Sequence, residues 1–195
     1  METQKNFLQR NLGWIIPVGV VVIIALWSVA GYNSFVRSNT AIDGQWAQVE
    51  TQYQRRFDLI PNVVNAVKGY DTHEQAIYDS ITLARTQYAG ATTPDAKAAA
   101  ATQVEAGLGR LLVVAESNPQ LQSAPLFQSL TVELEGTENR ISVERMKYNT
   151  LVQSYNTGVQ TFPSSVLAGM FGFHARTYFN APEAAQSAPT VNFAN

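Results

Sequence analysis

The most constraining feature of this sequence is a seven-residue repeat of large apolar side chains between Leu126 and Phe162. The repeat and the residues that widen it are Leu134, Ile141, Tyr148, Tyr155 and Phe162, with Leu130, Val152 and Val159 beside them. Because seven residues make about two helical turns, these side chains share one face of an α-helix. The spacing predicts a long helix whose apolar face must be covered by partner helices.

Composition narrows the classes of function. The chain has 195 residues and a net charge of -2, so it lacks the basic excess that nucleic-acid-binding proteins use against phosphates. It contains no cysteine and only two histidines, which excludes disulfides and thiolate metal sites and disfavours a histidine-rich metal site. We therefore expect no cofactor and no nucleic-acid partner.

An uncharged apolar run extends from Leu12 to Tyr32. A helix of this length spans about 30 Å, the thickness of the hydrocarbon layer of a bilayer. Trp14 lies near one end of the run and Trp27 near the other, where indole rings favour the membrane interface. The run predicts a transmembrane helix over residues 12–33, preceded by a short polar segment, residues 1–11.

A cleaved signal peptide is the alternative, because Ser28-Val29-Ala30 has the small-x-small pattern of a cleavage site. The apolar run is longer than a usual signal core, which favours a retained anchor. Lys5 and Arg10 precede the run and Arg37 follows it. The positive-inside rule then predicts a cytoplasmic amino terminus and a domain outside the cytoplasm, in the periplasm if the cell has one.

Residues 34–163 show helical periodicity almost throughout. The first apolar face comprises Ile42, Trp46, Val49, Tyr53, Ile60, Val64, Val67, Ile77, Ile81, Ala84 and Tyr88. Pro61 and the stretch Lys68-Gly69-Tyr70 interrupt this pattern, so one kinked helix and two helices are both open. Thr93 and Pro94 predict the cap and first residue of the next helix. The pattern predicts an all-α bundle of about four helices.

The next helix runs to Ala115 or Glu116, and Ser117-Asn118-Pro119 ends it. Its apolar face comprises Val104, Leu108, Leu111 and Leu112, and its small residues Ala106, Gly107 and Gly109 predict close approach to a neighbour. Pro163 ends the central helix after Phe162.

Residues 164–195 form a tail of different character. Ser165–Phe173 is apolar and contains glycine, whereas Ala181–Pro189 is rich in alanine and proline and is predicted to be mobile. The aromatic residues of the tail are Phe173, Tyr178, Phe179 and Phe193. We expect them to pack back on the bundle; the alternative is an exposed segment that binds a membrane or a partner.

Several long motifs resemble the LemA family of bacterial membrane proteins. They are QRRFDLIPNVVNAVKGYDTHE (Gln54 to Glu74), LGRLLVVAESNPQL (Leu108 to Leu121), ELEGTENRISVERMKYN (Glu133 to Asn149), SYN (Ser154 to Asn156), FP (Phe162, Pro163), AGMFGF (Ala168 to Phe173) and PTVNF (Pro189 to Phe193). The resemblance covers nearly everything from about Ile42 onward. It implies an antiparallel helical bundle on one amino-terminal membrane span, and it carries over no catalytic residue.

Charged residues border the apolar faces of two predicted helices, with Lys68, Glu133 and Glu144 nearby. We predict an interhelix polar network drawn from Arg55, Arg56, Asp58, Glu135, Glu138, Arg140 and Arg145. A buried pair of this kind costs about 3–5 kcal/mol when one partner is removed, whereas exposed pairs are worth about 0–1 kcal/mol.

The pairs Tyr148-Asn149 and Tyr155-Asn156 repeat at seven residues, beside the apolar face. We interpret the asparagines as setting helix register through hydrogen bonds, as buried asparagine does in coiled coils. A pocket for a small ligand or lipid lined by these four residues is the alternative.

The sequence disfavours three kinds of reactive or metal site. His73-Glu74 lacks a second histidine one turn on, because Ile77 occupies that position. No glutamate precedes a histidine by three residues, as a carboxylate-bridged di-iron bundle requires. Glu133, Glu135 and Glu138 are spread around a helix instead of gathered in a loop, which favours a solvated face over a calcium site.

We therefore expect a protein that is not an enzyme. The first hypothesis is a membrane-anchored scaffold or adaptor of the cell envelope that partners the lipid bilayer, further copies of itself as a homo-oligomer, or other membrane proteins. The second is a sensor that binds a ligand or lipid between its helices.

Overall fold

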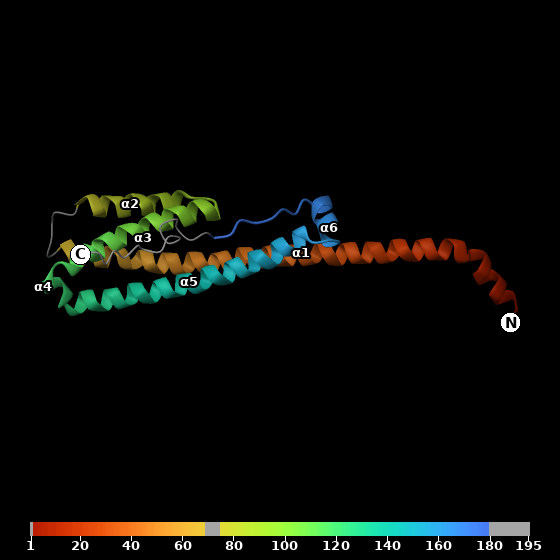
Figure 1. Ribbon diagram of the computed structural model, residues 1–195, viewed down its shortest axis with the longest axis horizontal. Coiled ribbons are helices and arrows are strands. Elements are labelled where there is room, and N and C mark those ends of the chain that lie inside the picture. The colour runs from red at the N-terminus through yellow and green to blue at the C-terminus, as the bar shows by residue number, and fades with distance from the viewer. Residues whose placement is uncertain (1, 69–74, 180–195) are drawn as a thin grey trace, which may run out of the picture. The chain divides into compact units, whose positions relative to one another are not determined.

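The computed structural model describes residues 2–68 and 75–179, with side chains from Gly13 onward. All regular elements in these ranges are helices, which confirms the all-α prediction (Figure 1). The helices are α1 (Glu2–Lys68), α2 (Gln75–Gly90), α3 (Pro94–Glu116), α4 (Pro119–Gln122), α5 (Pro125–Gln160) and α6 (Ser164–Phe171). Three predicted features, His73-Glu74, the mobile Ala181–Pro189 and Phe193, lie outside the described residues.

α1 is one helix from Glu2 to Lys68 and passes through Pro61 without ending, so Pro61 does not divide it. The second predicted interruption, at Lys68-Gly69-Tyr70, falls where α1 ends, and Gly69 and Tyr70 lie outside the described residues. The most apolar window of α1 has a mean hydropathy of 2.3 and is 0% buried. α3 is also long and apolar enough to cross a membrane, but 39% of its most apolar window is buried. That burial is typical of a helix in a protein core, whereas none of the residues that the structure describes covers the apolar window of α1.

The chain divides into two compact units. Unit 1 comprises Met1–Ile42 and Leu151–Arg176, and unit 2 comprises Asp43–Thr150 with the chain from Thr177 onward. α1 and α5 each contribute residues to both units. The predicted boundaries at residues 33 and 163 stay predictions.

Unit 1 is held by aromatic packing and one close helix approach. The Phe35 ring lies 5.1 Å from that of Phe173 and 6.1 Å from that of Tyr155. At Gly31, a β-carbon would stand 2.6 Å from Leu167 Cδ1, so glycine permits α6 to approach α1 closely. Phe173 of the tail therefore packs, as expected. Gly172, at φ 73°, ends α6 in the left-handed conformation that favours glycine.

Phe162 is a correction, because its side chain is 84% exposed although the repeat placed it on the apolar face. α5 ends at Gln160, and beyond that residue seven-residue spacing no longer keeps side chains on one face. The other four members of the repeat, from Leu134 to Tyr155, are buried.

Unit 2 contains the larger core. Its buried apolar side chains from four helices include Trp46, Val49, Tyr53, Ile60, Val63 and Val67 of α1, Ile81, Ala84 and Tyr88 of α2, Val104, Leu108 and Leu111 of α3, and Leu134, Ile141 and Tyr148 of α5. Val63, and not the predicted Val64, is fully buried. α2 and α3 lie side by side (Figure 1).

The ends of α3 agree with the sequence only in part. Thr93 caps the helix by accepting a hydrogen bond from the Ala96 amide, and Pro94 is its first residue, as predicted. The short helix α4, which Asn118 caps, was not expected. Gly107 meets Ile81 of α2, but Gly109 faces open space, so only one of the two glycines serves a close approach.

Candidate functional site

Three helices of unit 2 bring a chain of charged side chains into its interior. Glu105 of α3 accepts a 2.7 Å hydrogen bond from Arg145 of α5 and lies 3.8 Å from the Arg56 guanidinium of α1. Arg56 also pairs with Glu138 of α5. The side chains of Arg56, Arg145 and Glu105 are 10%, 15% and 18% exposed, whereas that of Glu138 is 44% exposed and lies at the surface. We call these four residues the ionic cluster; its two positive and two negative charges balance.

Tyr53 adjoins the ionic cluster from α1. It is 0% exposed, and its hydroxyl accepts a hydrogen bond from Arg145, whose guanidinium also stands 5.2 Å from the Tyr53 ring centre. Burial, reinforced by the charge of Glu105, raises the pKa of Tyr53 above its ordinary value. Burial also lowers the pKa of Arg56, an effect that the charge of Glu105 opposes. These charged groups are occupied with one another inside unit 2.

The other members of the predicted network lie on the surface. Arg55, Asp58, Glu135 and Arg140 are exposed, and Asp58 accepts a hydrogen bond from Gln54 one helical turn away. Arg55 and Arg140 line an open hollow of about 380 Å³. Sequence reasoning thus identified Arg56, Glu138 and Arg145 but missed Glu105. The available signal was that Glu105 is the one acidic residue of α3 between its two ends, directly after the buried Val104.

Glu144, a further candidate, lies outside the ionic cluster. Its carboxylate accepts hydrogen bonds from Lys147 at 2.8 Å and from Gln45 at 2.6 Å. The Lys147 hydrogen bond, followed by that of Gln45, lowers the pKa of Glu144.

Residues 177–179, which we call the strap, are held on unit 2. The Asn149 side chain donates to the Phe179 carbonyl at 2.9 Å and accepts from the Phe179 amide at 2.8 Å. The Phe179 ring lies 4.4 Å from the Arg145 guanidinium and is stacked 6.2 Å from the Trp46 ring. We call Trp46, Arg145 and Asn149 the Phe179 socket. The strap therefore covers one end of the ionic cluster.

Two further contacts fix the strap. The Thr177 hydroxyl donates to the Asp95 carboxylate at 3.1 Å, and the Tyr148 hydroxyl donates to the Thr177 carbonyl at 3.5 Å. Phe179 and Tyr178 line a hollow of about 220 Å³ with residues of α3, namely Asp95, Ala98, Ala99 and Thr102.

In unit 1 a second asparagine side chain also binds the amide and the carbonyl of one tail residue. Asn156 donates to the Arg176 carbonyl and accepts from the Arg176 amide, both at 2.8 Å, and the Arg176 guanidinium donates to Asn39. A carboxamide carries a donor and an acceptor side by side, which matches the N–H and C=O of one residue in an extended backbone. Both asparagines thus bind the tail, instead of the partner helix that register setting would need. The alternative, a ligand pocket lined by both asparagines and the tyrosines that precede them, stays a prediction.

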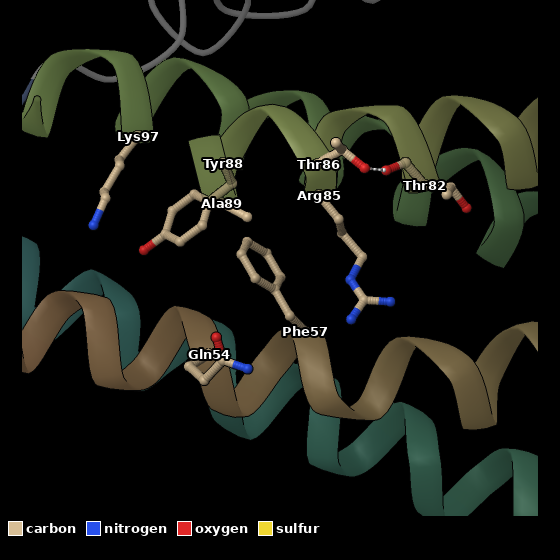
Figure 2. Close-up of a pocket in the computed structure, with 8 residues that line it drawn as sticks. All are labelled: Gln54, Phe57, Thr82, Arg85, Thr86, Tyr88, Ala89 and Lys97. Atoms are coloured by element: carbon tan, nitrogen blue, oxygen red, sulfur yellow. Dashed lines mark hydrogen bonds between the residues drawn. The ribbon is translucent and has the colours of Figure 1, made fainter. Parts of the chain in front are cut away.

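The largest hollow that we describe, about 580 Å³, lies between α1, α2 and α3 (Figure 2). It is lined by Gln54, Phe57, Thr82, Arg85, Thr86, Tyr88, Ala89 and Lys97. Lys97 pairs with Glu50, and the threonine hydroxyls donate to their own helix. In Figure 2 the Tyr88 hydroxyl points toward the side of Lys97, and the Arg85 guanidinium lies on the other side of Phe57. The polar groups do not converge on one point.

Comparison with known proteins places these features in a family. The chain matches the LemA family over residues 45–193. It is 25% identical to magnetosome protein MamQ 1 of Paramagnetospirillum magneticum, over 84% of this chain and 72% of the relative. It is 24% identical to MamQ of Magnetospirillum gryphiswaldense (84% and 73% covered) and 20% identical to protein LemA of Metamycoplasma hominis (88% and 78%). The match spans both asparagines, the ionic cluster and the strap, and the chain belongs to the LemA family.

Proposed function

We propose that this chain is a membrane-anchored scaffold or adaptor of the bacterial cell envelope, without a reaction of its own, that acts through self-association or by holding a partner. The observation that carries the proposal is the bare apolar part of α1. Its large side chains from Trp14 to Val29 are 41–79% exposed, and its most apolar window is entirely unburied.

A lipid bilayer is the environment that suits this segment. Each square ångström of apolar surface left in water costs roughly 25 cal/mol, and lipid removes that cost. The segment is continuous in α1 with the residues that build the core of unit 2, so the anchor and the folded part share one helix. We propose a cytoplasmic amino terminus. A reporter enzyme fused after Asn195 that is active only in the cytoplasm would reverse this orientation.

The proposed scaffold role is supported by apolar side chains on the surface of unit 2. Val132, Val143 and Met146 of α5 are 68%, 42% and 63% exposed, and their spacings of 11 and 14 residues from Val132 place them on one face of the helix. Exposed apolar side chains that gather on one face mark surfaces for protein association. The relatives' names mention a magnetosome in two organisms and no reaction. An association surface is therefore the activity that the described residues favour.

The test is the native mass of the full-length protein, gently extracted from its own membrane, with every component identified. The expected result is a particle of several copies or a defined complex with another protein. A variant with Val132→Glu and Met146→Glu should reduce that mass, whereas the matched control Gln128→Glu and Ser142→Glu, at exposed polar positions of the same helix, should not. A lone monomer would refute the proposal.

A further inference from the structure

The short helix α6 lies against α1 at the point where the uncharged apolar run of α1 ends (Figure 1). Leu167 packs so closely on Gly31 that a β-carbon there would stand 2.6 Å from Leu167 Cδ1. The next residue of α1, Tyr32, has its ring 5.1 Å from that of Phe171 and 5.6 Å from that of Phe173. These contacts lie within unit 1 and fix α6 at one end of the proposed membrane span.

The face that α6 turns away from α1 is apolar and bare. Leu167 and Ala168, on the side toward α1, are buried. Val166 and Met170, which are four residues apart and therefore share a face, are 52% and 72% exposed. Gly169 is exposed beside them, and a β-carbon there would meet no atom within 4 Å. α6 thus packs on α1 with one side and leaves an apolar side without cover from the described residues.

The two segments that meet here carry no charged side chain. Residues 11–36 and residues 148–175 contain no aspartate, glutamate, lysine or arginine. Charged side chains are the costliest groups to place in hydrocarbon, so their absence removes the main obstacle to contact with lipid. Tyr32, which lies between the two segments, is of the residue type that favours the boundary between head groups and acyl chains.

We propose that the exposed face of α6, formed by Val166, Gly169 and Met170, enters the same bilayer that α1 crosses, at the level of its head groups. This inference rests on the proposed function and deepens it by adding a second contact with lipid. Interfacial helices bury their apolar face by about 5–10 Å at this level. The partner is lipid because a spanning α1 already brings head groups and acyl chains to Gly31 and Tyr32, where α6 is fixed.

The second contact would change what the anchor does. A single spanning helix can turn about its own axis, whereas a helix with a second lipid contact on one side cannot turn without pulling that contact out of the membrane. α6 therefore sets the rotation and the depth of unit 1. An association surface on a protein held in this way meets its partners in a defined orientation.

The natural chain contains no cysteine, so a single cysteine can report the surroundings of α6. Full-length chains, each with one cysteine that carries a fluorophore, are reconstituted in vesicles of phosphatidylcholine and phosphatidylglycerol. Gly169→Cys reports on α6. Ile24→Cys, in the apolar run and 54% exposed, is the reference for lipid. Ala41→Cys is the reference for water, because it is exposed and lies roughly 13 Å beyond Tyr32 along α1.

Two quenchers distinguish the environments, namely a phospholipid with a nitroxide near the head of its acyl chain and iodide dissolved in the water. We expect the lipid nitroxide to quench the label at position 169 severalfold more than the label at position 41. Iodide should show the opposite order. Equal lipid quenching at positions 169 and 41 would overturn the inference, because contact with lipid would then not be confined to α6.

A charge on the exposed face provides the matched test. Met170→Glu, added to the Gly169→Cys chain, should lower the lipid quenching severalfold because the carboxylate stays in water. Ala41→Glu, added to the same chain, places an equal charge at an exposed position of α1 and should leave the quenching unchanged. Lipid quenching that Met170→Glu does not lower would contradict entry of this face into the bilayer.

The remaining outcomes separate this inference from the proposed function. Lipid quenching at position 24, with quenching only by iodide at position 169, overturns the contact of α6 and leaves the anchor intact. No lipid quenching at either position overturns both. A label at position 169 that is protected from both quenchers shows that a second copy covers α6, since the vesicles hold no other protein, and this overturns lipid as the partner.

Discussion

The two units hold the same tail with the same side chain but on different interiors. In unit 1, Asn156 holds Arg176, and the rings of Phe35 and Tyr155 lie 6.1 Å apart in the core of that unit. In unit 2, Asn149 holds Phe179 against Arg145, which belongs to an ionic cluster with three of its four side chains at most 18% exposed. An asparagine side chain therefore binds the tail backbone next to an aromatic core in one unit and next to charged side chains in the other. Different substitutions should destabilise the two cores.

The largest expected effect breaks the charged interior. Glu105→Ala removes the carboxylate near which two buried arginines meet, so unfolding should become easier by about 3–5 kcal/mol. Urea unfolding in a fixed detergent, followed by circular dichroism, measures the change. The matched control is Glu133→Ala at an exposed position, which should change stability by at most about 0.5 kcal/mol. Equal effects for the two variants would mean that the ionic cluster does not support the fold.

The second prediction tests the asparagine of unit 1. Asn156→Ala removes two hydrogen bonds and leaves the Arg176 amide and carbonyl without that partner, so stability should fall by about 2 kcal/mol. The same urea experiment reports it. Asn139→Ala, on an exposed position of α5, should have almost no effect. A loss larger than that of Glu105→Ala would reverse the ranking of the two interiors.

The third prediction compares the glycine contacts of the two units. A β-carbon on Gly107 would lie 2.6 Å from Ile81 Cγ1, which is held close to its backbone, so Gly107→Ala should cost about 1–2 kcal/mol. Gly31→Ala meets the flexible end of Leu167 at the same distance and should cost less. Gly136→Ala has open space and should stabilise α5 by about 0.5–1 kcal/mol. Thermal unfolding measures the three variants. Equal changes in unfolding temperature would mean that Gly107 and Gly31 are not needed for close packing.

The smallest effect appears only at alkaline pH. Burial raises the pKa of Tyr53, so the folded state favours the neutral phenol more than the unfolded state does. This stabilisation is complete below the unfolded value of about 10 and is lost as the pH rises above it. The drop in urea midpoint between pH 8 and pH 11 should therefore be smaller in Tyr53→Phe than in the natural protein. Tyr178→Phe, at an exposed position, is the control and should leave this drop as it is in the natural protein. If Tyr53→Phe also leaves the drop unchanged, other groups cause the loss of stability at alkaline pH.

Periodicity alone predicted the long helices and most of the core, because burial repeats with the helical turn at residues such as Val49, Tyr53 and Ile141. It did not predict the short helices α4 and α6. It failed where the helix itself ends, at Phe162. The candidate site was predicted only in part. Glu105 was missed because the pairing of charges depends on which helix faces which, and sequence spacing does not contain that information. The asparagines were identified as important, but their partners are backbone atoms of the tail, which leave no mark in a side-chain pattern.

The asparagine contacts carry a consequence for how this tail can vary. The Asn149 carboxamide binds the backbone amide and carbonyl of Phe179, so it depends on the backbone conformation of the segment and not on most of its side chains. Substitutions at Tyr178, which is 43% exposed, should therefore be tolerated, while proline at Phe179 should not, since it has no amide hydrogen to donate. The tail is therefore recognised mainly by its backbone conformation, and the Phe179 ring is the aromatic side chain of the tail that the Phe179 socket contacts.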